Sequence, residues 1–387
     1  MHDHPDGRIW VFDPERIAEP NRKHTTWVWN LIDSIHTIAD AKRIADCWRY
    51  ASGQPQTGGD DFFPGTAAQQ LADYLFAAHL GGRSVSDVFR WCSNERDTSP
   101  ADILSEYPRY AGIASRVSSV IALTPETRSG VFGSLQTMVA FLADPEIIDW
   151  IDPHRDTNGN IDERRGLFDP YEFATSEDTL YLLSAQGRPS TALTASLTAV
   201  VAFTAFQRAQ SEFTGNNRRL PVPLCCVLDE AANICRWPEL ADVYSYFGSA
   251  GIPIMTIWQN PDQGRAAFGE TNFGSLFNNA NITVYLGGIK DAKFLGEISQ
   301  LVGQREIVRG SVNIDGTGRR SVNNSIQKEN ILDVSDLTEW PVGRALLLAS
   351  QSRAQIVKTL PWTGNRQWAD ALTQAKAKAR EEQRKAA

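Results

Sequence analysis

The sequence of 387 residues contains only five cysteines and no CxxC pair. A structural zinc site is therefore not expected, and an odd number of cysteines argues against a disulfide framework. Cysteine usage thus indicates a reducing compartment. Cys225 and Cys226 are adjacent within an apolar run, where we expect both to be small core residues.

Long apolar runs are also absent. No stretch of about 18 uninterrupted apolar residues occurs, so no membrane-spanning helix is predicted. The first ten residues, MHDHPDGRIW, lack the apolar centre of a signal peptide. The chain as written is expected to be cytoplasmic, and any membrane anchor would require an additional N-terminal segment.

Basic residues are not in excess. The net charge is −8 at pH 7, which argues against a protein coated in nucleic acid, because phosphate binding needs a basic surface. This charge still allows a ring that contacts DNA through a few basic loops. Hydrophobic residues make up 42% and charged residues 22%, a globular balance in a chain long enough for two domains.

Apolar residues recur at helical spacing over residues 37–50 and again from about 64 to 150. No convincing strand pattern interrupts the second stretch, which predicts an all-helical block. The polar stretches at 53–61 and 153–165 predict loops on either side of it. The tryptophans in apolar surroundings are expected in the core: Trp10, Trp27, Trp29, Trp48 and Trp91.

After residue 165 the pattern changes to short apolar runs that alternate with helical stretches. Strands are predicted at 180–184, 224–228, 252–258, 282–286, 345–348 and 355–357. Helices are predicted at 190–211, 237–248, 290–302 and 366–387, and residues 307–330 are predicted to be an excursion rich in Gly, Asn and Ser. Continuous apolar strands separated by helices predict an α/β fold with a parallel sheet covered on both faces.

The strongest chemical signal is the apolar run 224–228 followed by Asp229 and Glu230. This is a Walker B pattern, in which a buried strand delivers two carboxylates to the ligand-binding edge of a parallel sheet. Asp229 would hold Mg²⁺ through water, and Glu230 would orient or polarise the attacking water. An acidic pair that only favours the N-terminus of the next helix is the alternative.

The next predicted strand, 252–258, ends at Gln259. A right-handed crossover makes the two strands parallel, so Gln259 should emerge at the same edge as Asp229 and Glu230. Its amide could then donate to a γ-phosphate or to the catalytic water. An amide that simply caps the next turn is the alternative.

The segments LDEAANI (228–234), GIPIMTIWQNPDQ (251–263) and FNNANITVYLGG (277–288) occur in an order that resembles the TraG/TraD family of conjugative coupling proteins. Further along, Ser299 and Gly303 fit the same pattern, and VFDP at 11–14 resembles an earlier strand of that family. The resemblance implies a RecA-like parallel sheet with flanking helices and an inserted all-α domain. It also implies ATP and Mg²⁺ as cofactors, a homo-hexamer, and single-stranded DNA, a relaxase and type IV secretion channel ATPases as partners.

The domain expectations follow from this resemblance. Residues 1–59 would begin the nucleotide-binding domain and residues 60–165 would form the inserted all-α domain. Residues 166–362 would complete the nucleotide-binding domain, and residues 363–387 would be a charged tail. The intact protein would act at the cytoplasmic face of the bacterial plasma membrane, linking relaxase-bound DNA to the secretion channel.

The sequence departs from the family pattern in its phosphate-binding segment. The sequence contains no GxxxxGK[ST] and no Gly-Lys dipeptide, although such a loop is what cradles phosphates in nucleotide sites of this kind. The resemblance therefore implies half a nucleotide site, so ATP and Mg²⁺ are expected only if that segment is supplied. Two alternatives stay open: a catalytically dead substrate-binding remnant, and a DNA-pumping ATPase of the FtsK/HerA kind. Arg265, Arg305 and Arg344 are candidates for an arginine that acts on a neighbouring subunit.

Overall fold

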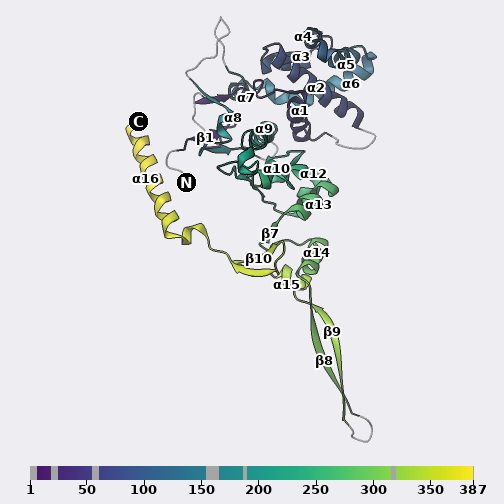
Figure 1. Cartoon of the computed structure of the whole chain (residues 1–387), viewed down its shortest axis with the longest axis vertical. Coiled ribbons are helices and arrows are strands. Elements are labelled where there is room, and N and C mark those ends of the chain that lie inside the picture. The colour runs from purple at the N-terminus through teal and green to yellow at the C-terminus, as the bar shows by residue number, and fades with distance from the viewer. Residues whose placement is uncertain are drawn as a thin grey trace. The chain divides into compact units, whose positions relative to one another are not determined.

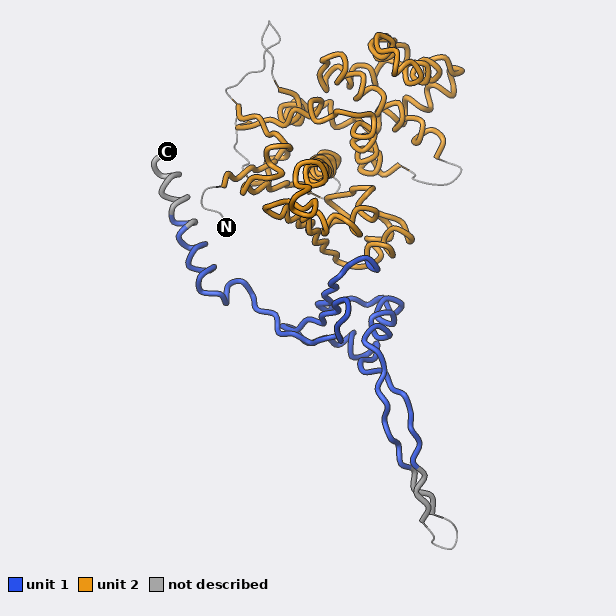
Figure 2. The backbone as a smooth tube through the Cα atoms, in the orientation of Figure 1, with its two compact units in different colours: residues 1, 277–387 blue, residues 2–276 orange. Residues whose placement is uncertain are grey.

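The computed structural model describes residues 7–18, 25–54, 61–153, 165–185, 190–314 and 320–386. The chain divides into two compact units, one of His2–Leu276 and the other of Phe277–Ala387 together with Met1 (Figure 2). Most of the predicted polar loops at 53–61 and 153–165 lies outside the described residues.

The larger unit contains the predicted helical block (Figure 1). Its helices are α1 (Ile38–Ala51), α2 (Phe62–Leu80), α3 (Val85–Ser93), α4 (Ser99–Ser105), α5 (Ala111–Ile121), α6 (Pro125–Val139) and α7 (Pro145–Ile151). No strand interrupts the described residues between α1 and α7, as predicted. Proline at the first turn of α4, α6 and α7 suits a position whose N–H has no partner within the helix. The five tryptophans predicted to be in the core are all buried.

Thr37 and Asp40 form a capping box at the start of α1. The Thr37 hydroxyl accepts from the Asp40 backbone N–H at 3.2 Å, and the Asp40 carboxylate accepts from the Thr37 N–H at 2.9 Å. Replacing Thr37 with alanine is expected to lower the free energy of unfolding by about 1 kcal/mol, measured by urea denaturation. Thr137→Ala, on the exposed side of α6, is the control and should cost nothing, because alanine is the better helix former. Equal losses in the two variants would contradict the capping role.

The strands of the larger unit pair in parallel, as the α/β expectation requires. β1 (Ile9–Phe12) pairs with β4 (Thr179–Leu182), and β2 (Trp27–Trp29) pairs with β3 (Gly166–Phe168). β5 (Cys226–Leu228) pairs with β6 (Ile254–Thr256). The short α8 (Pro170–Phe173) lies between β3 and β4 in the chain, and the long α9 (Ser190–Ser211) follows β4.

Helix α9 passes a length and hydropathy test for a membrane span, but 72% of its apolar window is buried inside the protein. The bent pair formed by residues 125–143 and 145–151 passes the same test as one broken span. Within α9, Leu193, Ala195, Leu197 and Ala199 are all buried in the hydrophobic core. A helix that is apolar all round and enclosed by protein is a core helix.

One face of β5 and β6 is more exposed than the sequence predicted. The sheet was expected to be covered on both faces, yet Val227 of β5 is 57% exposed and Met255 of β6 is 56% exposed. Cys225, predicted to be a core residue, is exposed just before β5, whereas Cys226 is half-buried. Successive strand residues point to opposite faces, so Cys225 and Val227 lie on the face that the described residues leave uncovered.

The helix predicted at 237–248 is interrupted. The structure contains α10 (Ala231–Ile234), α11 (Leu240–Val243) and a 3₁₀ turn at Phe247–Ala250 instead. Pro238 follows the buried Trp237, and a proline disfavours helical geometry in the residue before it. Two further helices, α12 (Pro261–Phe268) and α13 (Glu270–Asn279), follow β6.

The smaller unit is built on a three-stranded antiparallel sheet in the order β11–β10–β7. Its strands are β7 (Ile282–Tyr285), β10 (Arg344–Ala349) and β11 (Gln355–Lys358). Helices α14 (Ala292–Val302) and α15 (Val334–Thr338) pack on one face, and α16 (Arg366–Ala386) follows the sheet. The shared core consists of Tyr285, Phe294, Leu295, Ile298, Leu337 and Leu346.

Three residues that carry the family resemblance have structural roles in this unit. The Tyr285 hydroxyl donates to the Leu337 carbonyl at 2.8 Å, and the Ser299 hydroxyl donates to the Leu332 carbonyl at 2.5 Å. Gly303 ends α14 with a φ of 95°, a value that glycine adopts without strain. These positions therefore fix how α14 and α15 sit on the sheet.

For residues 307–330 the sequence predicted an excursion rich in Gly, Asn and Ser, without strands of its own. The structure forms a long antiparallel hairpin there, with β8 (Gln304–Ile314) paired to β9 (Arg320–Asn330). Its residues are mostly polar, so the apolar alternation that reveals a half-buried strand is weak.

Candidate functional site

The acidic pair and Gln259 meet at the carboxyl ends of two adjacent parallel strands. Val227 pairs with Met255 and Leu228 pairs with Thr256. The ladder continues past the strands, since the Ile257 N–H donates to the Leu228 carbonyl at 3.0 Å. Asp229 and Glu230 therefore leave β5 at the same edge at which residues 257–259 leave β6, as the crossover argument predicted.

Glu230 has an unusual backbone conformation, and each of its carboxylate oxygens has a side-chain partner. Its φ of 49° lies in the left-handed region, which is uncommon for a residue with a side chain and is typical of strained positions near functional sites. Gln259 Nε2 donates to Glu230 Oε1 at 2.5 Å, and Asn233 Nδ2 approaches Glu230 Oε2 at 3.5 Å. The half-buried carboxylate is thus oriented from two sides.

The alternative reading of Gln259 as a simple helix cap does not describe its contact. The cap of α12 is the next residue, Asn260, whose Oδ1 accepts from the Gln263 N–H at 2.9 Å. Pro261 follows at the first helical position. Gln259 is left to bond Glu230 across the two strands, so a neutral amide donor stands beside the carboxylate.

Asp229 is exposed at the strand edge, next to Glu230. Mg²⁺ prefers carboxylate oxygens and usually keeps several of its waters, so an exposed carboxylate is suited to hold it through water. The residues present therefore fit the metal. They do not supply the phosphate-binding half of a nucleotide site, because the sequence holds no GxxxxGK[ST].

Sequence reasoning missed Asn233. It lies on α10, three residues after Glu230, and is almost completely buried. Its backbone N–H donates to the Glu230 carbonyl at 2.8 Å, in addition to the side-chain contact with the carboxylate. The three-residue spacing is a weak signal for this contact, because Glu230 precedes α10 and has a left-handed rather than a helical backbone.

The candidate arginines differ in their surroundings. Arg265 on α12 forms ion pairs with Asp262 at 2.9 Å and Glu270 at 3.3 Å. Arg305 on β8 approaches Glu329 only at 3.6 Å, and the Arg344 side chain at the start of β10 is exposed. Arg265 is therefore the one that its own chain restrains most.

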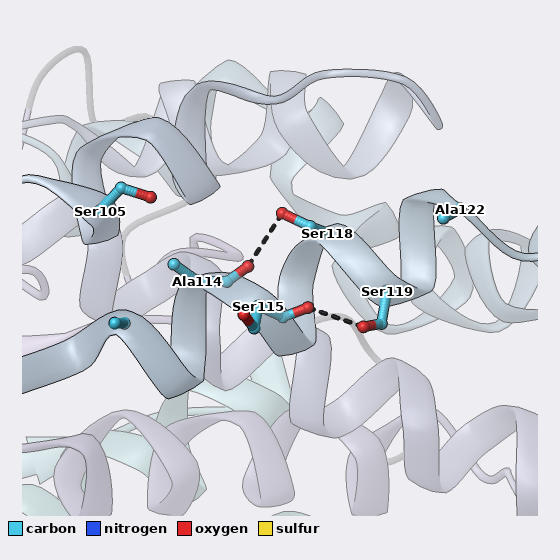
Figure 3. Close-up of a pocket in the computed structure, with 7 residues that line it drawn as sticks. Ser105, Ala114, Ser115, Ser118, Ser119 and Ala122 are labelled. Carbon is cyan, nitrogen blue, oxygen red and sulfur yellow. Dashed lines mark hydrogen bonds between the residues drawn. The ribbon is translucent and has the colours of Figure 1, made fainter.

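A separate surface hollow of about 540 Å³ lies on the helical block (Figure 3). It is lined by serine and alanine side chains of α4 and α5 and the residue after α5. The Ser118 hydroxyl donates to the Ala114 carbonyl at 3.0 Å, and the Ser119 hydroxyl donates to the Ser115 carbonyl at 2.8 Å. With no charged group in its lining, this hollow is not suited to nucleotide phosphates. Among the described residues, no group of three or more His, Cys, Asp or Glu side chains is arranged to hold a metal ion.

Comparison with known proteins finds a family match over part of the chain. Residues 223–342, which include the whole site, match the model of the family described as the TraM recognition site of TraD and TraG. No curated protein sequence matches the chain.

Among solved structures, the unbound bacterial conjugative coupling protein TrwB is similar, with a TM-score of 0.61 and 16% sequence identity over 91% of this chain and 73% of that one. TrwB in complex with ADP and Mg²⁺ gives a TM-score of 0.58 and 15% identity over 92% of this chain and 79% of that one. The complex of TrwB with a non-hydrolysable ATP analogue gives 0.59 and 15% with the same coverage. The TM-scores show a shared fold despite the low sequence identities, and this confirms the predicted α/β class with its helical block. Residues 223–342 are therefore similar to the TraD and TraG family, and the chain as a whole shares the fold of TrwB.

Proposed function

We propose that this chain acts in a conjugative or type IV secretion system, where it recruits relaxase-bound single-stranded DNA to the secretion channel or helps to pump it. The observation that carries the proposal is the Gln259–Glu230 hydrogen bond at the β5–β6 edge, inside the segment that matches the TraG/TraD family. The family match also favours a coupling protein over a DNA-pumping ATPase of the FtsK/HerA kind.

The proposed roles at the site follow from the geometry. Asp229 would hold Mg²⁺ through water, and the metal would neutralise charge on nucleotide phosphates. Glu230, fixed by Gln259 and Asn233, would accept a hydrogen bond from the attacking water and orient it. Gln259 would exchange its bond to Glu230 for one to a γ-phosphate, which would report the nucleotide state.

Hydrolysis by this site requires a phosphate-binding loop that the printed sequence does not contain. The second candidate function is a catalytically inactive subunit that binds substrate through its helical block. The two candidates differ in whether the edge that carries Asp229 and Glu230 takes part in ATP hydrolysis.

The proposed partners follow from the comparisons. The matched family is described as a TraM recognition site in TraD and TraG, which supports a relaxosome protein as a partner here. Assembly as a homo-hexamer, contact with the channel ATPases, and a place at the cytoplasmic face of the plasma membrane complete the proposal.

The test is DNA-stimulated ATP hydrolysis by this chain and by a form extended upstream to include a GxxxxGK[ST] loop. Activity in the extended form alone is expected, because phosphate binding and the acidic edge must both be present. No activity in either form would favour the inactive binding subunit. Activity in the short chain that persists after Glu230→Gln would show that the site lies elsewhere.

A further inference from the structure

The hairpin of β8 and β9, residues 304–330, is called the arm here. Figure 1 shows its two strands side by side, extending from the region of α14 and α15. Within the described part of the chain, neither strand pairs with any other strand. A two-stranded ribbon in water is marginally stable by itself, so an arm of this length gains from packing one face against something else.

One face of the arm carries an apolar pair. Val308 and Ile326 lie directly opposite each other in the register and are 68% and 69% exposed. The next pair on the same face, two residues along each strand, is Glu306 opposite Lys328, and both side chains are exposed. The face therefore presents an apolar row beside a row with one negative and one positive charge.

This face is complementary to itself. If two arms pack face to face, pointing the same way about a two-fold axis along their length, each strand faces the opposite strand of the other arm. Val308 then meets Ile326 of the second copy, and Glu306 meets Lys328 of the second copy, in both directions. An isologous contact needs a patch that matches itself in this way.

We propose that the arm is a self-association surface, and that its partner is the arm of a second copy of this chain. An apolar centre beside charged pairs is the composition of a protein interface. A nucleic acid would favour a face of uniformly positive charge, whereas Glu306 and Lys328, the charged residues on this face whose side chains the structure describes, are of opposite sign. The contact joins copies in pairs and is distinct from the ring contact of the proposed hexamer, which must be heterologous.

The test exploits the charge pattern and uses the full 387-residue chain without nucleotide. Glu306→Lys puts lysine against Lys328 of the second copy, and Lys328→Glu puts glutamate against Glu306. Each single variant is expected to self-associate at least tenfold more weakly than the wild type in sedimentation equilibrium, because like charges then face each other twice. The double variant, with the charges exchanged, is expected to recover the wild-type association.

Mixing the two single variants separates contact between copies from strain within one arm. Each single variant keeps a like-charge pair inside its own arm, so recovery on mixing can come only from pairing between different copies. Heterodimers in the mixture, detected by native mass spectrometry with one variant isotopically labelled, are the expected result. A monomeric wild type, or a mixture without heterodimers, would overturn the proposal. Arm variants that lose binding to a single-stranded oligonucleotide while self-association is unchanged would overturn it as well.

Discussion

Glu230→Gln in the upstream-extended form is expected to reduce DNA-stimulated ATP hydrolysis about 100- to 10,000-fold, the range typical for loss of a positioned acid–base group. ATP binding should persist, because Asp229 and the phosphate loop would still hold the metal and nucleotide. The reason is geometric. Glu230 is fixed in a left-handed backbone conformation with Gln259 on one carboxylate oxygen, and glutamine keeps the shape while losing the basic oxygen.

The control for this variant is Glu297→Gln, the same chemical change at an exposed position on α14, which should leave hydrolysis unchanged. Steady-state hydrolysis and equilibrium binding of a fluorescent ATP analogue are measured on the same preparations. Equal loss of binding and hydrolysis would mean that Glu230 holds the nucleotide rather than the water. Retained hydrolysis would remove Glu230 from the mechanism.

The positions of Glu230 and Gln259 could be predicted because parallel strands joined by a right-handed crossover present their carboxyl ends at one edge. That rule needs only two apolar runs with a helical pattern between them, and the sequence from 224 to 258 contains this arrangement. The contact of Asn233 could not be predicted in the same way. It depends on the left-handed turn at Glu230, which brings α10 back over the carboxylate and leaves no trace in apolar periodicity.

The strands of the arm and the uncovered strand face were not predicted, because at both places the apolar pattern does not match the structure. The periodicity of apolar residues indicates which side chains are buried, and the described residues bury neither the arm nor this strand face. The arm is held by the backbone hydrogen-bond ladder between β8 and β9, which polar residues form as well as apolar ones. Conversely, Val227 and Met255 sit in apolar runs that predict burial, yet the described residues leave them exposed.

A buried ion pair in the helical block gives the second prediction with a large effect. The Asp73 side chain on α2 is fully buried, and Arg116 on α5 clamps both of its oxygens at 2.6 and 2.8 Å. Arg116→Met is expected to lower the free energy of unfolding by about 3 kcal/mol near pH 7, because it leaves a buried carboxylate without its counter-charge and with only the Gln69 amide as a side-chain donor. This is the low end of the usual range, since the Arg116 side chain is 43% exposed.

The cost of Arg116→Met should depend on pH. Burial raises the pKa of Asp73 in the folded protein, while the hydrogen bond and charge of Arg116 lower it. An acid whose pKa is higher in the folded state stabilises the fold below its unfolded pKa, and this contribution is lost as pH rises through the folded pKa. Without Arg116 the pKa of Asp73 rises further, so the loss extends to higher pH.

Urea denaturation between about pH 5 and pH 7 measures this dependence. The difference between Arg116→Met and the wild type should shrink as pH falls, because a growing fraction of Asp73 in the variant is then protonated and needs no counter-charge. In an Asp73→Asn background, Arg116→Met should cost less and show no such pH dependence, since the amide does not titrate. A difference that is the same at every pH, in both backgrounds, would mean that Arg116 stabilises α2 through packing of its alkyl chain and not through its charge.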